Sequence, residues 1–440
     1  MSARGEELTT QVETIRAVRG TRDLLPPETA RWNFVESATR EVFRNYNFHE
    51  IRTPIFEKTE LFARGVGEET DIVSKEMYTW EDQSGKSDGA AGAGQSLTLR
   101  PENTAGVVRA YIEHKLWERG LNKLYYIGPQ FRRERPQKGR YRQFYQIGAE
   151  VIGPPSSGTE SPARDAELLE LLATLLDRLR IQDWRLELNS IGCEEDRARY
   201  NQALRQALGP VVRKLCDDCQ RRAETNPLRV FDCKVPADQP IIDTLPRISQ
   251  FLDEPCRQHF DEVQRILNSV RVPYTLNDRL VRGLDYYTRT AFEFTHGALG
   301  AQNAILGGGR YDGLSESLGG PQAPGIGFAI GEDRLVMSLG DSAEAAVRKP
   351  DVYLAPLGPG MNQEAARLAR ELRRQNLIVE LGEESFRLKK SLELASKMGA
   401  KYALIAGENE LSTGVFALKN LATGEQRAVA RDRLVPEIQR

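Results

Sequence analysis

Two apolar stretches on either side of a strongly basic segment set the tightest limit on the fold of this chain. Leu124–Phe131 and Gln143–Gly153 are rich in aromatic and β-branched residues, which is typical of strands. Between them, Arg132–Arg142 carries six arginine and lysine residues against the single Glu134, and a proline and a glycine there indicate a loop. The pattern predicts two antiparallel strands joined by a long cationic loop.

The cationic loop favours a ligand that carries phosphate groups. Guanidinium groups bind phosphate oxygens two at a time, so a polyphosphate or the end of a nucleic acid would suit it. A solvated charged hairpin would explain the same charges. The second strand argues against that alternative, because Gln146 and Glu150 share one face of it. Polar groups on an otherwise buried strand need partners, and a polar substrate would supply them.

The stretch FRRERPQKGRYRQFYQIGAE, residues 131–150, resembles motif 2 of the class II aminoacyl-tRNA synthetases in the form found in histidyl-tRNA synthetases. Other stretches are similar to the same family: RGTRDLLP from Arg19, TLRPE-x-T from Thr98, RGLDYY from Arg282 and GGGRYDGL from Gly307. Phe48–Phe56 resembles motif 1, and Pro324–Leu335 resembles motif 3, a strand followed by a helix that begins near Glu332. The resemblance extends from Arg19 to the C-terminus.

The resemblance implies an α+β class II synthetase catalytic domain over residues 1–345, in which helices flank an antiparallel sheet. Residues 194–270 are rich in charges and helical periods, so we expect a mostly helical insertion there. A linker spans 346–350. Residues 351–440 alternate strand and helix patterns, which predicts a small, largely parallel α/β domain of three layers. This domain resembles the anticodon-binding domain of class II synthetases.

Motif 1 bears on assembly. We expect a strand over Phe48–Phe56, although Pro54 inside it would also suit an edge strand. In class II enzymes motif 1 forms the dimer interface, so the resemblance implies a homodimer.

Composition limits where and how the protein acts. The net charge is only −2, so contacts with RNA must come from local basic patches. We find no run of 18 apolar residues and no apolar signal-peptide core near the N-terminus, and we therefore expect a cytoplasmic protein that does not enter a membrane.

The cysteines raise the question of a metal. Cys216-x-x-Cys219 and Cys233 suggest zinc, with Cys256 or His259 as a fourth ligand. The spacing matches no pattern of two CxxC pairs, so we expect reduced structural cysteines and no metal.

The resemblance implies the activity of a histidine–tRNA ligase, an aminoacyl-tRNA synthetase. Histidine and ATP give histidyl-adenylate and pyrophosphate, and the histidyl group then passes to the 3′ end of tRNA(His). Magnesium is expected on the β- and γ-phosphates of ATP. The family assigns catalysis to Arg282, Arg132 and Glu102.

The remaining roles are carried over by motif. Histidine is expected to contact Glu102, Asn103, Thr104, Gln146, Glu150, Arg282, Tyr286 and Tyr287. ATP is expected to contact Arg132, Gln146 and Arg334. The acceptor end of tRNA is expected to contact Arg133, Arg135, Lys138 and Arg140.

A histidine-binding regulatory paralogue of ATP phosphoribosyltransferase is the alternative function. That paralogue typically lacks the C-terminal domain and has degraded ATP motifs. This chain keeps Arg132, Arg282 and Arg334 and continues through residues 351–440, which favours the ligase.

Overall fold

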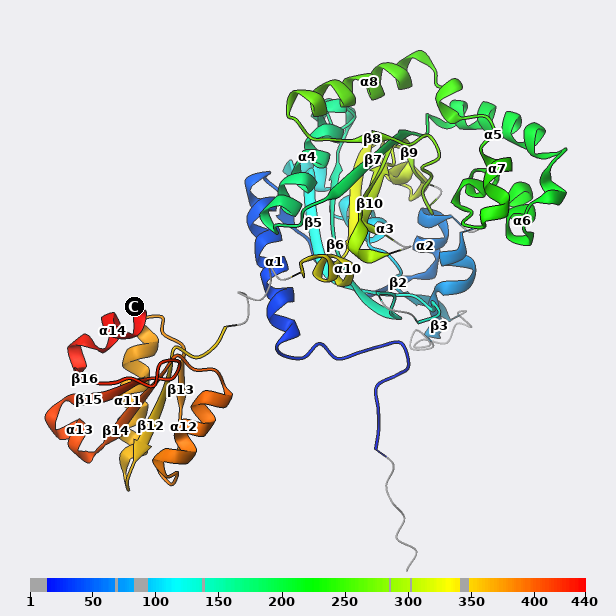
Figure 1. Cartoon of the computed structure of the whole chain (residues 1–440). Coiled ribbons are helices and arrows are strands. Elements are labelled where there is room, and N and C mark those ends of the chain that lie inside the picture. Colours follow the sequence, from blue (N-terminus) through cyan, green and yellow to red (C-terminus); the bar gives the residue numbers. More distant parts are fainter. Residues whose placement is uncertain are drawn as a thin grey trace, which may run out of the picture. The chain divides into compact units, whose positions relative to one another are not determined.

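The computed structural model describes residues 14–67, 70–82, 94–136, 139–284, 286–300, 303–340 and 348–440. The chain divides into two compact units, Met1–Glu344 and Ala345–Arg440 (Figure 1). Within the described ranges, no helix is both long enough and apolar enough to cross a bilayer.

An eight-stranded sheet forms the centre of the first unit, in the order β1-β5-β6-β11-β10-β9-β7-β8. Its strands are β1 (His49–Glu50), β5 (Lys123–Phe131), β6 (Gln143–Ile152), β7 (Trp184–Ser190), β8 (Thr275–Leu276), β9 (Thr288–His296), β10 (Ala304–Arg310) and β11 (Gly325–Gly331). The inner neighbours run antiparallel, and only the edge pairs β1–β5 and β7–β8 are parallel. The expected α+β class II fold is confirmed, with parallel pairing restricted to the edges.

The β5–β6 hairpin forms as the sequence predicted, with Phe131 opposite Gln143 at the loop end. Alternation along β5 divides its side chains between two apolar cores, since Tyr125 packs into one and Tyr126 into the other. The sheet is therefore covered on both faces.

The larger core lies between the sheet and helices α1 (Glu28–Asn45), α4 (Pro162–Arg178), α8 (Glu254–Ser269) and α10 (Glu332–Ser338). Figure 1 shows α1 and α4 along one side of β5. The α4 helix begins with the Ser161 side chain accepting the amide of Ala163 and with Pro162 in the first turn, as helix starts often do. On the other face pack α2 (Thr59–Val66), α3 (Thr104–Glu113) and α9 (Leu314–Ser317).

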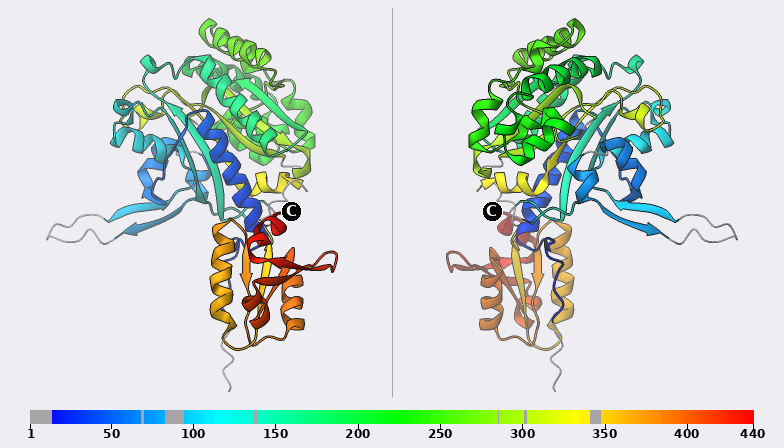
Figure 2. Two further views of the ribbon diagram at one scale, coloured as in Figure 1. Left: turned by 90° about the vertical axis from the view of Figure 1, so that its left-hand side faces the viewer. Right: turned by 90° about the vertical axis from the view of Figure 1, so that its right-hand side faces the viewer.

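A second, three-stranded sheet has the order β2-β4-β3. Its strands are β2 (Phe56–Lys58), β3 (Tyr78–Asp82) and β4 (Gln95–Leu99), and β3 and β4 (light blue in Figure 2) project from the unit. The single strand predicted over Phe48–Phe56 is wrong, because that stretch divides into β1 and the start of β2. Pro54 lies in the break, where the Arg100 guanidinium binds the carbonyl oxygens of Thr53 and Pro54.

The chain between β7 and β8 is helical. It contains α5 (Glu194–Leu208), α6 (Asp217–Thr225), α7 (Gln239–Ile242), α8 and the short 3-10 turns η4 (Val212–Lys214), η5 (Pro227–Asp232), η6 (Pro236–Asp238) and η7 (Ile248–Gln250). Side chains such as Tyr200, Leu204 and Phe231 form a small core of their own there. The later part of α8 instead packs into the large core through Val263 and Leu267.

The second unit has a five-stranded sheet in the order β13-β12-β14-β15-β16. Its elements are β12 (Val352–Leu357), α11 (Met361–Arg374), β13 (Val379–Leu381), α12 (Leu388–Lys397), β14 (Tyr402–Gly407), α13 (Glu408–Thr413), β15 (Val415–Asn420), β16 (Gln426–Ala430) and α14 (Leu434–Gln439). Only β13, β12 and β14 are parallel, so the sheet is less parallel than predicted. The short connection from β15 to β16 can join only antiparallel neighbours.

Candidate active site

A cavity of about 980 Å³ opens beside the large sheet. Arg132 and Arg140 reach it from the motif 2 loop, and Arg334 reaches it from α10. The insertion contributes Arg222 and Arg229 to the same wall. Cationic side chains from distant parts of the sequence therefore line one space together with carboxylates such as Glu76, Glu134 and Glu293, which suits an anionic ligand that brings a divalent cation with it.

Arg132 is held in place by neighbours on both sides. Its Nε donates to the carbonyl oxygen of Pro101 at 2.8 Å, and its guanidinium lies 5.2 Å from the centre of the Phe144 ring. Nη1 lies 3.8 Å from a carboxylate oxygen of Glu134. These contacts fix the guanidinium at the cavity wall and leave donors for phosphate oxygens.

Arg334 lies in the first turn of α10 and lines the cavity. Its Nη1 donates to the carbonyl oxygen of Ala304 at 2.6 Å. Burial, together with the charge of Arg140, lowers the pKa of Arg334. A negatively charged ligand between these two arginines would relieve that repulsion.

Deeper in the sheet, a buried polar cluster surrounds Glu150. One carboxylate oxygen of Glu150 accepts a 2.7 Å hydrogen bond from Oγ1 of Thr104. Burial raises the pKa of Glu150 to about 8, and the charge of Glu102 contributes to the rise. Among the described residues, no lysine, arginine or histidine is paired with either carboxylate, so the cluster can accept a cationic ligand.

Glu102 also serves the fold. Its two carboxylate oxygens accept the backbone N–H groups of Thr104 and Ala105 at 2.8 and 3.0 Å, at the start of α3. The side chain is buried, and burial raises its pKa. The neighbouring Asn103 accepts from Thr53 through Oδ1, while its Nδ2 is buried without a partner. Glu102 therefore holds the start of α3, and both side chains keep unused polar capacity.

Arg282 lies against the sheet at Gly307. A Cβ atom at Gly307 would come within 2.4 Å of Nη2 of Arg282, so only glycine leaves room for the guanidinium. Nη1 donates to Glu293 at 2.8 Å, and Nε is buried without a partner among the described residues. The guanidinium also lies 5.9 Å from the centre of the Tyr287 ring. The predicted catalytic arginine is thus positioned from three sides.

Three tyrosines complete the cluster. The rings of Tyr286 and Tyr287 lie 4.7 Å apart, and Tyr286 is 5.9 Å from Tyr311. On β6, Gln146 is buried and its Oε1 has no hydrogen-bond partner in the described structure. A buried amide oxygen without a partner can accept a hydrogen bond from a ligand that carries an N–H donor.

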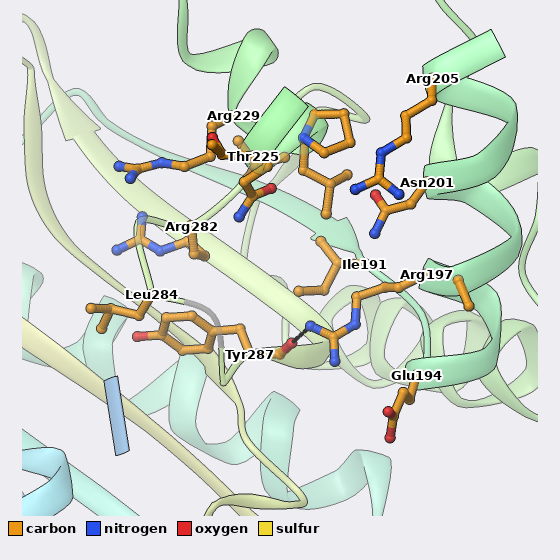
Figure 3. Close-up of a pocket in the computed structure, with 15 residues that line it drawn as sticks. Ile191, Glu194, Arg197, Asn201, Arg205, Thr225, Arg229, Arg282, Leu284 and Tyr287 are labelled. Carbon is orange, nitrogen blue, oxygen red and sulfur yellow. Dashed lines mark hydrogen bonds between the residues drawn. The ribbon is translucent and has the colours of Figure 1, made fainter. Parts of the chain in front are cut away.

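A smaller pocket of about 350 Å³ adjoins Arg282 and Tyr287. Figure 3 shows Arg229 and Arg282 side by side at one end of it. Arg197 of α5 donates to the carbonyl oxygen of Tyr287 at 2.8 Å, which ties the insertion to the RGLDYY stretch. Asp285 of that stretch lies outside the described residues.

The arginines of the motif 2 loop differ in whether they line the large cavity. Arg133 and Arg135 are exposed, and the Arg133 guanidinium lies 5.0 Å from the Tyr78 ring centre. Arg140 is exposed too, but it lines the large cavity and lies 3.3 Å from Glu134. Lys138, predicted to contact tRNA, lies outside the described residues.

The structure places Arg132, Arg140 and Arg334 around the large cavity. It groups Glu102, Thr104, Glu150, Tyr286 and Tyr287, with Arg282 beside Tyr287, whereas Arg133 and Arg135 lie apart on the loop. Two further residues in these groups were not predicted from the sequence. Tyr311 donates to Glu150 at 2.6 Å, and Glu293 pairs with Arg282. Tyr311 stands inside the quoted GGGRYDGL stretch, where it could have been found. Glu293 has no motif around it, and only the pairing of β9 with β10 places it near Arg282.

Comparison with known proteins agrees with this geometry. A family described as "Histidyl-tRNA synthetase" matches residues 20–335, and one described as "Anticodon binding domain" matches residues 351–440. The chain is 68% identical to the histidine–tRNA ligase of Koribacter versatilis over 421 residues, which cover 96% of this chain and 95% of the relative. It is 57% identical to the corresponding ligase of Solibacter usitatus over 427 residues, 96% of this chain and 99% of the relative. The crystal structure of apo S. aureus histidyl-tRNA synthetase is 35% identical, with a TM-score of 0.77 and coverage of 97% of this chain and 100% of that one.

Proposed function

Because the chain belongs to the histidyl-tRNA synthetase family, we propose specific roles for its active-site residues in that family's reaction. The chain is an aminoacyl-tRNA ligase whose partners are histidine, ATP and tRNA. The regulatory paralogue is not favoured, since relatives matching nearly the whole chain at 57–68% identity are histidine–tRNA ligases.

Histidine binds in the buried polar cluster. Its ammonium group and its ring N–H are cationic or donor groups, and Glu102 and Glu150 are two buried acidic side chains that form no ion pair among the described residues, although the charge of Arg132 acts on Glu102. Asn103, Thr104 and Gln146 add further polar contacts. Tyr286 and Tyr287 line the ring. This pairing of buried charge with a polar, cationic amino acid is the observation that carries the proposal.

Arg282 and Arg132 assist the first step. The histidine carboxylate oxygen attacks the α-phosphorus of ATP, the bond to the bridging oxygen breaks, and pyrophosphate leaves. Negative charge gathers on the α-phosphate oxygens as this happens, and fixed guanidinium groups stabilise it without reorganising. Arg282 is positioned for this by Glu293, Gly307 and Tyr287, and Arg132 by Pro101.

The far part of the nucleotide occupies the large cavity, where Arg334 contacts it and Gln146 reaches it from β6. Magnesium, when bound, neutralises charge on the β- and γ-phosphates. Glu76 and Glu134 line the same cavity and carry the oxygen ligands that this ion prefers. Burial and the nearby Glu134 raise the pKa of Glu76, and a divalent cation beside these carboxylates would lower it again.

The second step transfers the histidyl group to a hydroxyl at the 3′ end of tRNA(His), and AMP leaves. Arg133, Arg135 and Lys138 hold the acceptor end, with Arg140 at the edge of the ATP cavity. Residues 351–440 bind the anticodon. The enzyme works as a homodimer in the cytoplasm, where its tRNA is found.

The direct test is histidine-dependent exchange of pyrophosphate into ATP, followed by charging of tRNA(His). We expect exchange with histidine alone, without tRNA, and charging when tRNA is added. A chain that binds histidine but neither exchanges pyrophosphate nor charges tRNA would contradict the proposal.

A further inference from the structure

Four metal-ligand side chains converge in the insertion, at the edge of the large cavity, which one of them, Cys233, also lines. They are Cys216, Cys219, Cys233 and Asp238, and one ligand atom from each lies within 4.8 Å of all the others. We refer to them as the Cys3Asp cluster. Cys219, Cys233 and Asp238 are buried and Cys216 is partly buried, so the site is closed to bulk water on most sides.

The spacing within the cluster fits a tetrahedral metal better than a disulfide. The sulfur atoms of Cys216 and Cys233 are 3.9 Å apart, whereas a disulfide bond is about 2.0 Å long. Sulfur atoms about 2.3 Å from a tetrahedral zinc ion would be separated by roughly 3.8 Å. Oδ2 of Asp238 lies 3.2 Å from the Cys233 sulfur, near enough to complete the tetrahedron after a small shift.

We propose that the Cys3Asp cluster binds one structural Zn²⁺ ion. Thiolate sulfur binds zinc in preference to magnesium or calcium. Four protein ligands complete a tetrahedral site and leave no open position for catalysis. Three thiols lose their protons to solvent on binding, and the doubly charged ion offsets half of the four negative charges of the three thiolates and Asp238.

Backbone groups are arranged to support such a site. The N–H of Val235 donates to the Cys233 sulfur at 3.4 Å, and the N–H of Cys216 donates to both oxygens of Asp238 at 3.1 and 3.2 Å. Such outer contacts orient metal ligands. Cys216 precedes α6 and Cys219 lies three residues later on the same side, which explains the Cys-x-x-Cys spacing.

A second group of possible ligands, Cys193, Asp196, Asp253 and Cys256, has only two cysteines, and an arginine is paired with one of its carboxylates. Asp253 accepts the N–H of Cys256 at the start of α8, and Asp196 accepts the N–H of Asp253 and pairs with Arg199. From the sequence, either Cys256 or His259 was a possible fourth ligand. The structure places Cys256 in this second group and pairs His259 with Asp165 at 2.8 Å.

The ion would fix a part of the insertion that has little regular structure. Residues between α5 and α8 form only short helices and 3-10 turns around a small core. A bound metal ion can stabilise a region whose apolar core is small. Cys233 follows η5 directly, and Arg229 and Asp232 of η5 line the large cavity. Zinc would therefore keep these cavity residues in place.

The test is metal analysis of the full-length protein purified without added metal. We expect about one zinc per chain, lost in Cys219→Ser and retained in the matched control Cys256→Ser. Cobalt substituted for zinc should give thiolate-to-cobalt charge-transfer bands and tetrahedral ligand-field bands in the wild-type chain. Wild-type protein that contains no zinc and gives no cobalt spectrum would overturn the proposal, as would zinc lost from Cys256→Ser and kept in Cys219→Ser.

A second variant covers the case in which Cys219→Ser does not fold. Asp238→Asn keeps the shape of the side chain but weakens the ligand, so zinc affinity measured with a competing chelator should fall at least about tenfold. Unchanged zinc affinity would remove Asp238 from the site. A disulfide between Cys216 and Cys233 in freshly purified, zinc-free protein, seen by mass spectrometry, would replace the metal interpretation.

Discussion

Oη of Tyr311 donates a 2.6 Å hydrogen bond to Oε2 of Glu150, and both side chains are fully buried. Gly327 faces Glu150 across the β6–β11 pair, and a Cβ atom there would lie only 1.7 Å from Oε2. Only glycine at position 327 therefore leaves room for the Glu150 carboxylate. Burying a carboxylate without a basic partner costs folding stability, so its role is better explained by ligand binding.

Removing that carboxylate should damage histidine binding selectively. Glu150→Ala should raise the KM for histidine about 10–100-fold, because a hydrogen bond to a charged group is lost, and should leave the KM for ATP nearly unchanged. Tyr311→Phe should raise the histidine KM less, since the carboxylate itself remains. Pyrophosphate exchange measures both constants, with the exposed Glu160→Ala as the control. An equal loss for both substrates would mean that Glu150 is misplaced.

The raised pKa of Glu150, about 8, predicts opposite effects of pH on stability and on binding. The folded, ligand-free chain holds a proton that the unfolded chain releases near pH 4.5, so this group's contribution to stability falls as the pH rises from 4.5 to 8. Histidine binding should strengthen over the upper part of that range as the carboxylate ionises. Melting temperatures of wild type and Glu150→Gln should therefore diverge in favour of the variant as the pH rises. Parallel curves would contradict the assignment, and binding is best measured above about pH 7, where free histidine has a neutral ring.

Arg282 should matter for chemistry more than for folding. Arg282→His should lower the rate of pyrophosphate exchange about 10²–10³-fold, because a fixed positive charge beside the reacting phosphate is lost. Arg185→His, at an exposed position on β7, is the control. Wild-type exchange in the Arg282 variant would exclude the residue from the first step.

Most of the elements followed from local pattern. The strands on either side of the basic loop, the strand–helix of motif 3 and the alternation after residue 351 were predicted because periodicity and turn residues act within a few positions. The single strand over Phe48–Phe56 was predicted wrongly, because the Arg100 guanidinium binds the carbonyl oxygens of Thr53 and Pro54 in the break, and Arg100 is more than 40 residues away in sequence.

The site was predictable to the extent that its residues stand in motifs. Glu102, Glu150 and Arg282 were found in this way, whereas Glu293 depends on strand pairing that no local pattern reveals. The fourth ligand of the Cys3Asp cluster was missed for a related reason. Asp238 follows Cys233 on a 3-10 turn, and only the fold of the whole insertion returns it to Cys216.

The exposed apolar side of motif 1 predicts a dimer that a single charge would break. Ile55 and Phe56 are 44% and 53% exposed, and Trp80, itself 41% exposed, lies 6.0 Å from Phe56 between ring centres. An apolar patch of this kind marks an interface. Phe56→Glu should give a monomer by light scattering at micromolar concentration, whereas Leu276→Glu, at the exposed edge strand β8, should stay dimeric. A wild-type chain that is already monomeric would reject the dimer.

Truncation should distinguish the anticodon contact, assigned to residues 351–440, from the reaction at the active site. The first unit has its own core, so deleting residues 346–440 should leave histidyl-adenylate formation largely intact while charging of tRNA(His) falls steeply. Pyrophosphate exchange and tRNA charging on the same preparation measure the two effects, and circular dichroism checks that the shortened chain is folded. Normal charging by the truncated chain would exclude residues 351–440 as the anticodon-binding part.

The acceptor-end contact should respond differently, because it lies beside the reacting groups. Arg133 and Arg135 are exposed on the motif 2 loop, whereas Arg140 lines the ATP cavity. Replacing Arg133 and Arg135 by alanine should therefore weaken tRNA binding without changing ATP binding. Charging should fall while pyrophosphate exchange without tRNA continues at nearly the wild-type rate. The slope of log affinity against log salt should also fall by roughly one unit for each phosphate contact removed. A double variant with an unchanged salt slope would show that these arginines do not bind the phosphates of tRNA, and equal loss of exchange and charging would place them in the ATP site instead.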